Sequence, residues 1–227
     1  MSLTVISSMA TRQILAELGA TYLQRHGCDV ATTSIGGVEA VRRVSTGEAF
    51  DLVVLAQNAM SKLEVSGNLL PGSRAEFARS SVAVAIRSGE ERPRIDDEQE
   101  VKETVLKARA LAYSSGPSGD HLMRLVDRWG IAGSISQRLV QAPPGVPVGS
   151  LLARGEADLG FQQLSELLDI PGVEVLGLLP AAIQSETVFS VGICSRCGKL
   201  DEARELIGFL TSPETGAAKR RHGLEPV

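Results

Sequence analysis

One stretch of this sequence occurs twice, and it decides the fold class. The two copies read TGEAFDLVVL at residues 46–55, before the amides Gln57 and Asn58, and RGEADLGF at residues 154–161, before Gln162 and Gln163. In both copies a Gly suits the left-handed position that ends a helix, and an Asp introduces a short apolar run. Such a run is typical of a strand covered on both faces, as in a parallel sheet. The copies therefore predict two α/β lobes, with amide side chains at strand ends, where open α/β sheets bind ligands.

Strands and helices alternate along the rest of the chain. We expect further strands at residues 3–6, 29–33, 51–55, 82–86, 110–113, 138–141, 173–178 and 187–193. We expect helices that end near Arg25, Thr46, Val65, Ala108, Trp129, Gly155, Leu210 and His222. This alternation predicts the α/β class with mainly parallel sheets.

Composition and charge exclude several classes of protein. Of the 227 residues, 43% are hydrophobic and 22% are charged, which is ordinary for a globular protein. Aromatic residues make up only 4%, which is too few for a site that stacks single-stranded nucleic acid. The net charge is −4, and the basic cluster at residues 219–222 suits a helix end better than a phosphate backbone. We therefore expect no nucleic-acid binding. We also expect no membrane span, because no stretch reaches the ~20 apolar residues that a span needs.

The three cysteines do not form a complete disulfide or metal framework. Cys28 stands apart, and Cys194 and Cys197 form a single CxxC motif. A zinc site would need two more ligands, and the three histidines lie far from the motif in sequence. We favour an incidental pair or a local disulfide over a redox or metal role. The sequence therefore predicts no metal and no cofactor.

Four loops share one design, in which a strand ends, small hydroxyl or Gly residues follow, and a helix begins. The residues are Ser7 and Ser8; Ser34, Gly36 and Gly37; Ser114, Ser115, Ser118 and Gly119; and Gly145 with Val146. Helix N-termini present unpaired N–H groups and a partial positive charge, so such loops can bind an anion without a charged side chain. Each loop taken singly also reads as ordinary helix capping. Together they predict two half-sites for a small oxyanion, one in each half of the chain.

Catalytic motifs are absent from the sequence. We find no Gly-x-Ser-x-Gly elbow, no phosphate-binding P-loop, no His-Glu-x-x-His and no dinucleotide fingerprint. Arg79 and Ser80 lie where the chain is expected to pass between lobes. The fork-shaped guanidinium of Arg79 suits either a ligand carboxylate or a structural ion pair. We therefore favour binding over catalysis.

Seven stretches, in order along the chain, support a resemblance to a known family. They cover residues 47–54, 70–74, 78–80, 112–114, 154–163 with 165–166, 187–190 and 209–214. Together they resemble the ModA-like family of bacterial extracellular solute-binding proteins, the molybdate-type components of ABC transporters. The resemblance implies a type II periplasmic-binding-protein fold, with two lobes, two crossovers and hinge closure. It places lobe 1 at residues 1–80 plus about 198–227, and lobe 2 at about 81–197.

The resemblance also bears on the ligand. Molybdate binders of this family carry Ser at the first two strand–helix junctions, and here the first junction has Ser7 and Ser8. The second has Gly36 and Gly37, with Ser34 upstream, and Gln163 stands where those proteins carry a Tyr. These departures leave the identity of the anion open. Other members of the wider group resemble aconitate isomerase, which implies a tricarboxylate as an alternative ligand.

Three hypotheses follow. The first is an exported binding protein that delivers a small anion to an ABC permease from the periplasm or the extracellular space, in which case Met1-Ser2-Leu3 replaces a removed export signal. The second is an isomerase that acts on a tricarboxylate in the same cleft. The third, the effector domain of a transcription regulator, would need a DNA-binding domain before Leu3. We favour the first, with Asn58, Arg79, Ser80, Gln162, Gln163 and the loop residues as ligand contacts.

Overall fold

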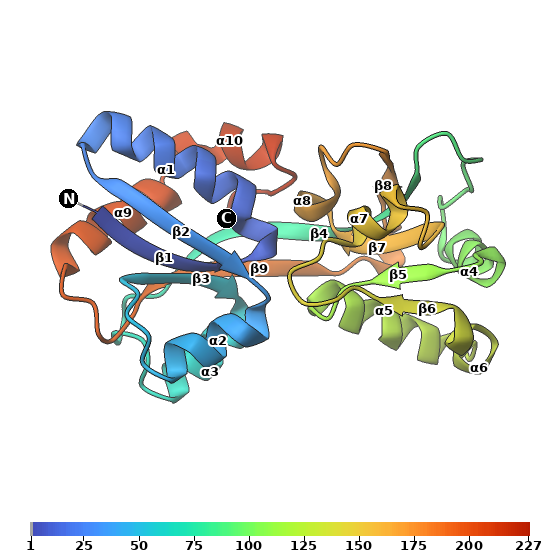
Figure 1. Ribbon diagram of the computed structural model, residues 1–227, viewed down its shortest axis with the longest axis horizontal. Coiled ribbons are helices and arrows are strands. Elements are labelled where there is room, and N and C mark those ends of the chain that lie inside the picture. Colours follow the sequence, from blue (N-terminus) through green and yellow to red (C-terminus); the bar gives the residue numbers. More distant parts are fainter. Residues whose placement is uncertain (1) are drawn as a thin grey trace. The chain divides into compact units, whose positions relative to one another are not determined.

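In the computed structural model, which describes residues 2–227, the chain divides into two units (Figure 1). Unit 1 runs up to Ser80 and resumes from Thr187 to Val227, and unit 2 is Ser81–Glu186. The chain therefore passes between the units twice. The sequence predicts a second lobe that runs to about residue 197, but residues 187–197 belong to unit 1. The reason is that strand β9 (Glu186–Ile193) forms an antiparallel pair with a strand of that unit from Phe189 to Ile193.

Unit 1 is a sheet with helices on both faces. Its strands β1 (Ser2–Ser8), β2 (Asp29–Ile35) and β3 (Leu52–Ala56) lie in the order β2-β1-β3 and are parallel, and β9 follows β3. Helices α1 (Arg12–His26), α9 (Leu200–Thr211) and α10 (Gly216–Arg221) cover one face, and α2 (Gly37–Ser45) and α3 (Gln57–Val65) cover the other. The short 3-10 helices η1 (Met9–Thr11) and η4 (Pro213–Thr215) precede α1 and α10.

Unit 2 has the same α/β plan. Strands β5 (Leu111–Tyr113), β6 (Leu139–Gln141) and β7 (Leu159–Gln163) are parallel, in the order β6-β5-β7. The long strand β4 (Ala75–Arg87) begins in unit 1 and pairs antiparallel with β7 and β8 (Val173–Leu178) in unit 2. Helices α4 (Glu98–Lys107) and α5 (Pro117–Arg128) pack on one face, and α7 (Val148–Ala153) and α8 (Leu164–Leu167) pack on the other. Three short helices complete the unit: α6 (Ala132–Ile135), η2 (Ser136–Arg138) and η3 (Ala181–Ile183).

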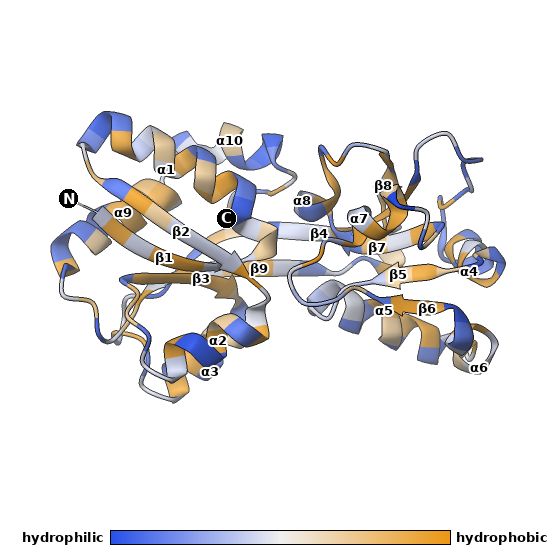
Figure 2. Cartoon of the chain, in the orientation of Figure 1, coloured by the Kyte–Doolittle hydropathy of each residue, from blue (hydrophilic) through white to orange (hydrophobic). Residues whose placement is uncertain are grey.

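The apolar runs of the repeated stretch are buried on both faces, which confirms the α/β prediction. Along β3, Leu52 and Val54 pack towards α1, whereas Val53 and Leu55 pack towards α2 and α3. All four side chains are fully buried. Strand β3 is accordingly hydrophobic along its length, while α2 and α5 alternate hydrophobic and hydrophilic residues (Figure 2). Gly47 and Gly155 follow α2 and α7 with φ of 87° and 72°, the left-handed conformation expected of helix-ending glycines.

The two Asp residues of the repeated stretch perform the same structural task. Asp51, before β3, accepts hydrogen bonds from the backbone N–H and hydroxyl of Thr4 in β1, at 2.8 and 3.0 Å. Asp158, before β7, accepts the backbone N–H groups of Arg109 and Ala110, just before β5, at 2.9 and 2.7 Å. Burial alone would raise the pKa of each carboxyl, but these hydrogen bonds outweigh it and leave both pKa values below the usual range. Each carboxylate therefore ties a strand to the amino end of its parallel neighbour.

The two carboxylates differ in how their oxygens are used, which predicts different tolerance to amidation. Separate oxygens of Asp158 accept the two N–H groups, so Asp158→Asn places an amide NH₂ against a backbone donor. We expect a loss of about 2 kcal/mol in the free energy of unfolding at pH 7. One oxygen of Asp51 accepts both groups of Thr4, and the other accepts only the thiol of Cys197, a weak donor, at 3.5 Å. Asp51→Asn should therefore cost less than about 1 kcal/mol. Urea denaturation of the two variants measures the difference, and equal losses would contradict this account.

Lys219 in α10 is a buried cation beside an aromatic ring. Its side chain is only 2% exposed, and its ammonium lies 4.7 Å from the centre of the Phe77 ring. No carboxylate among residues 2–227 forms an ion pair with it. Burial lowers the pKa of Lys219 to about 8. The ring offsets part of the cost of desolvating the charge.

Lys219 should make stability depend on pH in the alkaline range. Because the folded pKa of about 8 lies below the value of 10.5 for an exposed lysine, the unfolded chain binds more protons between these pH values. Its contribution to the free energy of unfolding should therefore rise by about 3 kcal/mol from pH 8 to pH 10.5. Lys219→Met should remove this rise when the variant is compared with wild type across the range. The exposed Lys62→Met is the matched control, and an identical difference curve for both variants would refute the assignment.

Candidate functional site

Serine hydroxyls gather where strands β1 and β2 end in unit 1. Ser7 and Ser34 are register partners, and their hydroxyl oxygens lie 2.8 Å apart. Ser7 is fully buried, and its hydroxyl also contacts the carbonyl oxygen of Ser8 at 3.2 Å. The hydroxyl of Ser8 is buried as an atom and has no hydrogen-bond partner among residues 2–227. The first two predicted loops therefore meet at one edge of the sheet, and one of their hydroxyls is unsatisfied.

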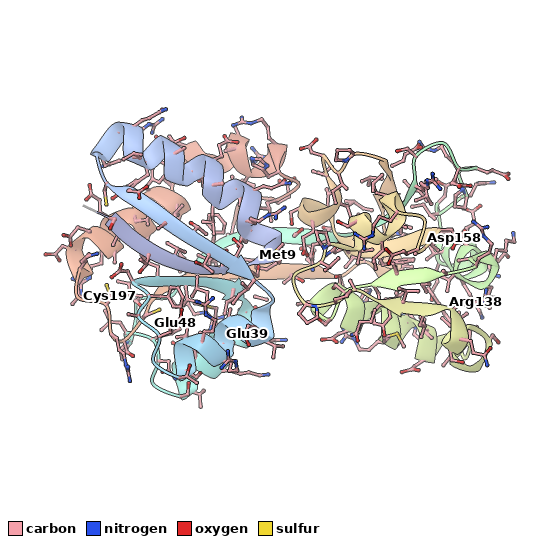
Figure 3. The ribbon with its side chains drawn as sticks, in the orientation of Figure 1. Met9, Glu39, Glu48, Arg138, Asp158 and Cys197 are labelled. Atoms are coloured by element: carbon pink, nitrogen blue, oxygen red, sulfur yellow. The ribbon has the colours of Figure 1, made fainter. Side chains whose placement is uncertain are left out.

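Helix α2 begins beside these hydroxyls with two bare glycines. Gly36 is the N-cap, with a φ of −60°, and no side chain caps the helix. A Cβ added at Gly36 or Gly37 would meet no atom within 4 Å, and neither residue has a left-handed φ. Packing and conformation thus do not require glycine at these two positions. What the glycines do provide is open access to the first N–H groups of α2, which lack intrahelical partners. Met9 and Glu39 mark this edge of unit 1 in Figure 3.

The loop before α5 in unit 2 has hydroxyls of the same kind. The hydroxyls of Ser114 and Ser118 lie 3.0 Å apart, and the Ser114 hydroxyl accepts the N–H of Gly116 at 3.3 Å. Ser118 is buried and Ser115 is exposed. Gly119, by contrast with the glycines of α2, is required by packing, because a Cβ there would lie 1.7 Å from the carbonyl oxygen of Ser114.

Several predicted donors are already used within unit 2. Gln162, which is 2% exposed, accepts the N–H of Val148 with its side-chain oxygen at 2.8 Å and donates to Glu166 at 2.9 Å. The N–H of Val146 donates to the carbonyl oxygen of Pro143 at 3.0 Å. The start of α7 therefore has fewer free donors than the sequence suggested. Sequence reasoning missed Glu166 as the partner of Gln162, although their spacing of four residues was a usable signal. Gln163 is also 2% exposed, at the end of β7.

The other predicted contacts in unit 1 are Asn58, Arg79 and Ser80, which lie on other elements than the serines of β1 and β2. Asn58 is exposed in the first turn of α3, directly after β3. Arg79 is exposed, and its backbone exchanges two hydrogen bonds of 2.8 Å with Glu225. Ser80, at the end of unit 1, is 2% exposed. Within residues 2–227 no three His, Cys, Asp or Glu side chains are grouped to hold a metal ion. No helix in the same range is both long and apolar enough to cross a membrane.

The chain has two α/β units, hydroxyl groups at its strand ends and an open helix N-terminus beside them. These are the features of a solute-binding protein. The family described as bacterial extracellular solute-binding protein matches residues 3–225, and this chain belongs to it. The solved structures that it resembles are periplasmic binding proteins of the type II fold.

Particular relatives are as follows. The chain is 34% identical over 232 residues to an aconitate isomerase of a Pseudomonas species, with 100% of this chain and 88% of that protein covered. The periplasmic molybdate-binding protein of Azotobacter vinelandii superposes with a TM-score of 0.83 and 21% identity over 98% of each chain. The sulfate-binding protein SubI of Mycobacterium tuberculosis H37Rv gives a TM-score of 0.80 and 15% identity over 100% of this chain and 87% of that one. At these identities the two structures show the fold alone.

The two kinds of glycine predict opposite responses to an added methyl group. Gly37→Ala should raise the free energy of unfolding by up to about 1 kcal/mol, because Ala is the better helix former and nothing obstructs its Cβ. Gly119→Ala should lower it by about 3 kcal/mol, because the backbone must shift to clear Ser114. Thermal and urea denaturation compare the two variants. Destabilisation by both would show that Gly37 is a structural glycine after all.

Proposed function

We propose that this protein is the binding component of an ABC importer and that it binds a small anion, either a molybdate-like oxyanion or a carboxylate. The observation that carries the proposal is the edge of unit 1 where Ser7, Ser8 and Ser34 meet the uncapped start of α2. Hydroxyls and backbone N–H groups offer hydrogen bonds to an anion, and the helix dipole favours its charge. Openness at Gly36 and Gly37, which packing does not demand, lets a ligand approach the backbone.

The other predicted contacts enter the proposal with less structural support. In unit 2 they are Ser114, Ser115, Ser118, Gly119, Val146, Gln162 and Gln163, and in unit 1 they also include Asn58, Arg79 and Ser80. On this proposal the protein works in the periplasm or the extracellular space, as its family suggests, and its protein partner is the permease of the transporter. The fold of the molybdate- and sulfate-binding proteins agrees with an anionic ligand.

A second candidate function rests on the aconitate isomerase relative, which matches the whole chain at 34% identity. An isomerase of an unsaturated tricarboxylate can work by moving one proton. A base removes it from the methylene carbon beside the double bond and returns it to the far alkene carbon. Among the predicted contacts, serines, glycines and amides cannot act as such a base at neutral pH. Glu166, which accepts a hydrogen bond from the predicted contact Gln162 at 2.9 Å, is a carboxylate that could act as the base.

Binding is tested by calorimetric titration of the full chain with molybdate, tungstate, sulfate and cis-aconitate. Ser8→Ala, which removes the hydroxyl that has no partner among residues 2–227, should weaken binding of the preferred anion about 10- to 100-fold, since it removes a hydrogen bond to a charged group. Gly37→Ala should also weaken binding, although it should not destabilise the fold. Ser134→Ala, which removes an exposed hydroxyl in unit 2, is the control and should bind like wild type. If no anion binds to the wild-type protein, the proposal fails.

Incubation with cis-aconitate, followed by chromatography for the trans isomer, separates the two candidate functions. A binding protein should return the substrate unchanged. If turnover is seen, Glu166→Gln should abolish it while retaining affinity for cis-aconitate, because the amide keeps a hydrogen-bonding group but cannot take a proton. Turnover that survives this substitution would exclude Glu166 as the base.

A further inference from the structure

Cys194 and Cys197 lie on one tight turn directly after β9. The backbone N–H of Cys197 donates to the carbonyl oxygen of Cys194 at 3.0 Å, which closes a four-residue turn through Ser195 and Arg196. A turn of this kind holds its first and fourth Cα atoms within about 7 Å. A disulfide spans Cα atoms about 4.4–6.8 Å apart. The main chain thus already holds the two residues at a separation that a disulfide can bridge.

The turn is anchored to unit 1 from three directions. The N–H of Cys194 donates to the carbonyl oxygen of Asp51 at 3.0 Å, and the N–H of Ser195 donates to that of Asn68 at 2.9 Å. The guanidinium of Arg196 donates to the carbonyl oxygen of Gly47 at 2.9 Å. These bonds use backbone groups and the Arg196 side chain, so a bond between the two sulfurs would leave them in place.

The surroundings of the thiols resemble those of a structural pair more than those of a thiol catalyst. Cys194 is 4% exposed, and burial, with the nearby Cys197 and Asp51, raises its pKa to about 12. Burial also raises the pKa of Cys197, whose thiol donates to the carboxylate of Asp51 at 3.5 Å. Catalytic CxxC pairs have the opposite property, a lowered pKa that supplies a reactive thiolate near neutral pH.

We propose that Cys194 and Cys197 are a thiol modification site and are joined by a disulfide within the turn when the protein is in an oxidising compartment. The family is extracellular, and disulfides form and persist in such compartments. Cys28 is not part of the turn: it is buried directly before β2, and its thiol donates to the carbonyl oxygen of Asp29 at 3.7 Å. The turn lies at the amino end of β3, away from the ligand-binding edge marked by Met9 (Figure 3).

The reaction is an exchange with a low-molecular-weight or protein disulfide. The more exposed Cys197 loses its proton and attacks one sulfur of the oxidant, which releases the first thiolate. Cys194 then loses its proton and attacks the Cys197 sulfur of the mixed disulfide, which releases the second thiolate. The two released thiolates take up the two protons. Two protein thiols are oxidised to one disulfide, and the oxidant is reduced to two thiols.

Trypsin cleavage of the purified full chain gives a direct test, since it cuts after Arg196, between the two cysteines. The protein is incubated with oxidised glutathione, alkylated in denaturant and digested without reductant. We expect peptide 197–199 to remain covalently attached to peptide 155–196, at a mass about 2 Da below the sum of the two free thiol peptides. Cys28 should carry the alkyl group, and reduction before alkylation should leave all three cysteines alkylated.

A stable glutathione adduct on either cysteine of the turn would overturn the proposal. Recovery of both cysteines as alkylated thiols, after incubation at an alkaline pH that ionises Cys197, would also overturn it. A disulfide that includes Cys28 would overturn the proposal as well. Because Cys28 takes no part in the proposed bond, the Cys28→Ser variant should form the 194–197 disulfide as wild type does. As a second measurement, oxidation should raise Tm by about 4 °C in wild type and in Cys28→Ser, but not in Cys197→Ser.

Discussion

The structure depends on a carboxylate placed at the entrance of an apolar strand. Asp51 and Asp158 each accept hydrogen bonds from the main chain at the start of the neighbouring parallel strand. Parallel pairing otherwise has to be established between segments far apart in sequence, at a high cost in chain entropy. A carboxylate that satisfies donors at the amino end sets the stagger of the pair. The same stagger brings the opposite ends of the strands together, and those ends carry the serines.

The consequence is visible in unit 1. With Asp51 bound to Thr4, Ser7 in β1 lies opposite Val54 in β3 and Ser34 in β2. The hydroxyls of Ser7 and Ser34 then meet, and α2 starts directly beyond them. The repeated stretch thus contributes to the candidate site from the far end of its strand. Its Asp residues are structural, although they are among the most recognisable residues in the sequence.

Much of the fold was predictable because its signals are local. Continuous apolar runs mark the strands, and glycines such as Gly47 and Gly155 mark the ends of helices. Both signals can be recognised without knowing which elements pair. The unit boundary near residue 186 was less accessible, since it depends on β9 pairing with β3, a contact between residues more than 130 positions apart. For a similar reason the sequence did not reveal that the backbone N–H groups of Val146 and Val148 already donate hydrogen bonds within the protein. A strand–helix junction looks the same in sequence whether its donors await a ligand or already bind a side chain such as Gln162.

The two sets of hydroxyls also differ in what they can do for a ligand. At the start of α5 the backbone is locked by Gly119 against Ser114, and the Ser114 hydroxyl is shared between Ser118 and Gly116. Around the start of α2 the backbone is open, and Ser8 retains an unsatisfied hydroxyl. A buried hydroxyl without a partner costs about 1–3 kcal/mol, a cost that an incoming oxygen atom can remove on binding. Since neither Gly36 nor Gly37 is needed for the fold, the open start of α2 is better explained by access for a ligand than by the architecture of unit 1.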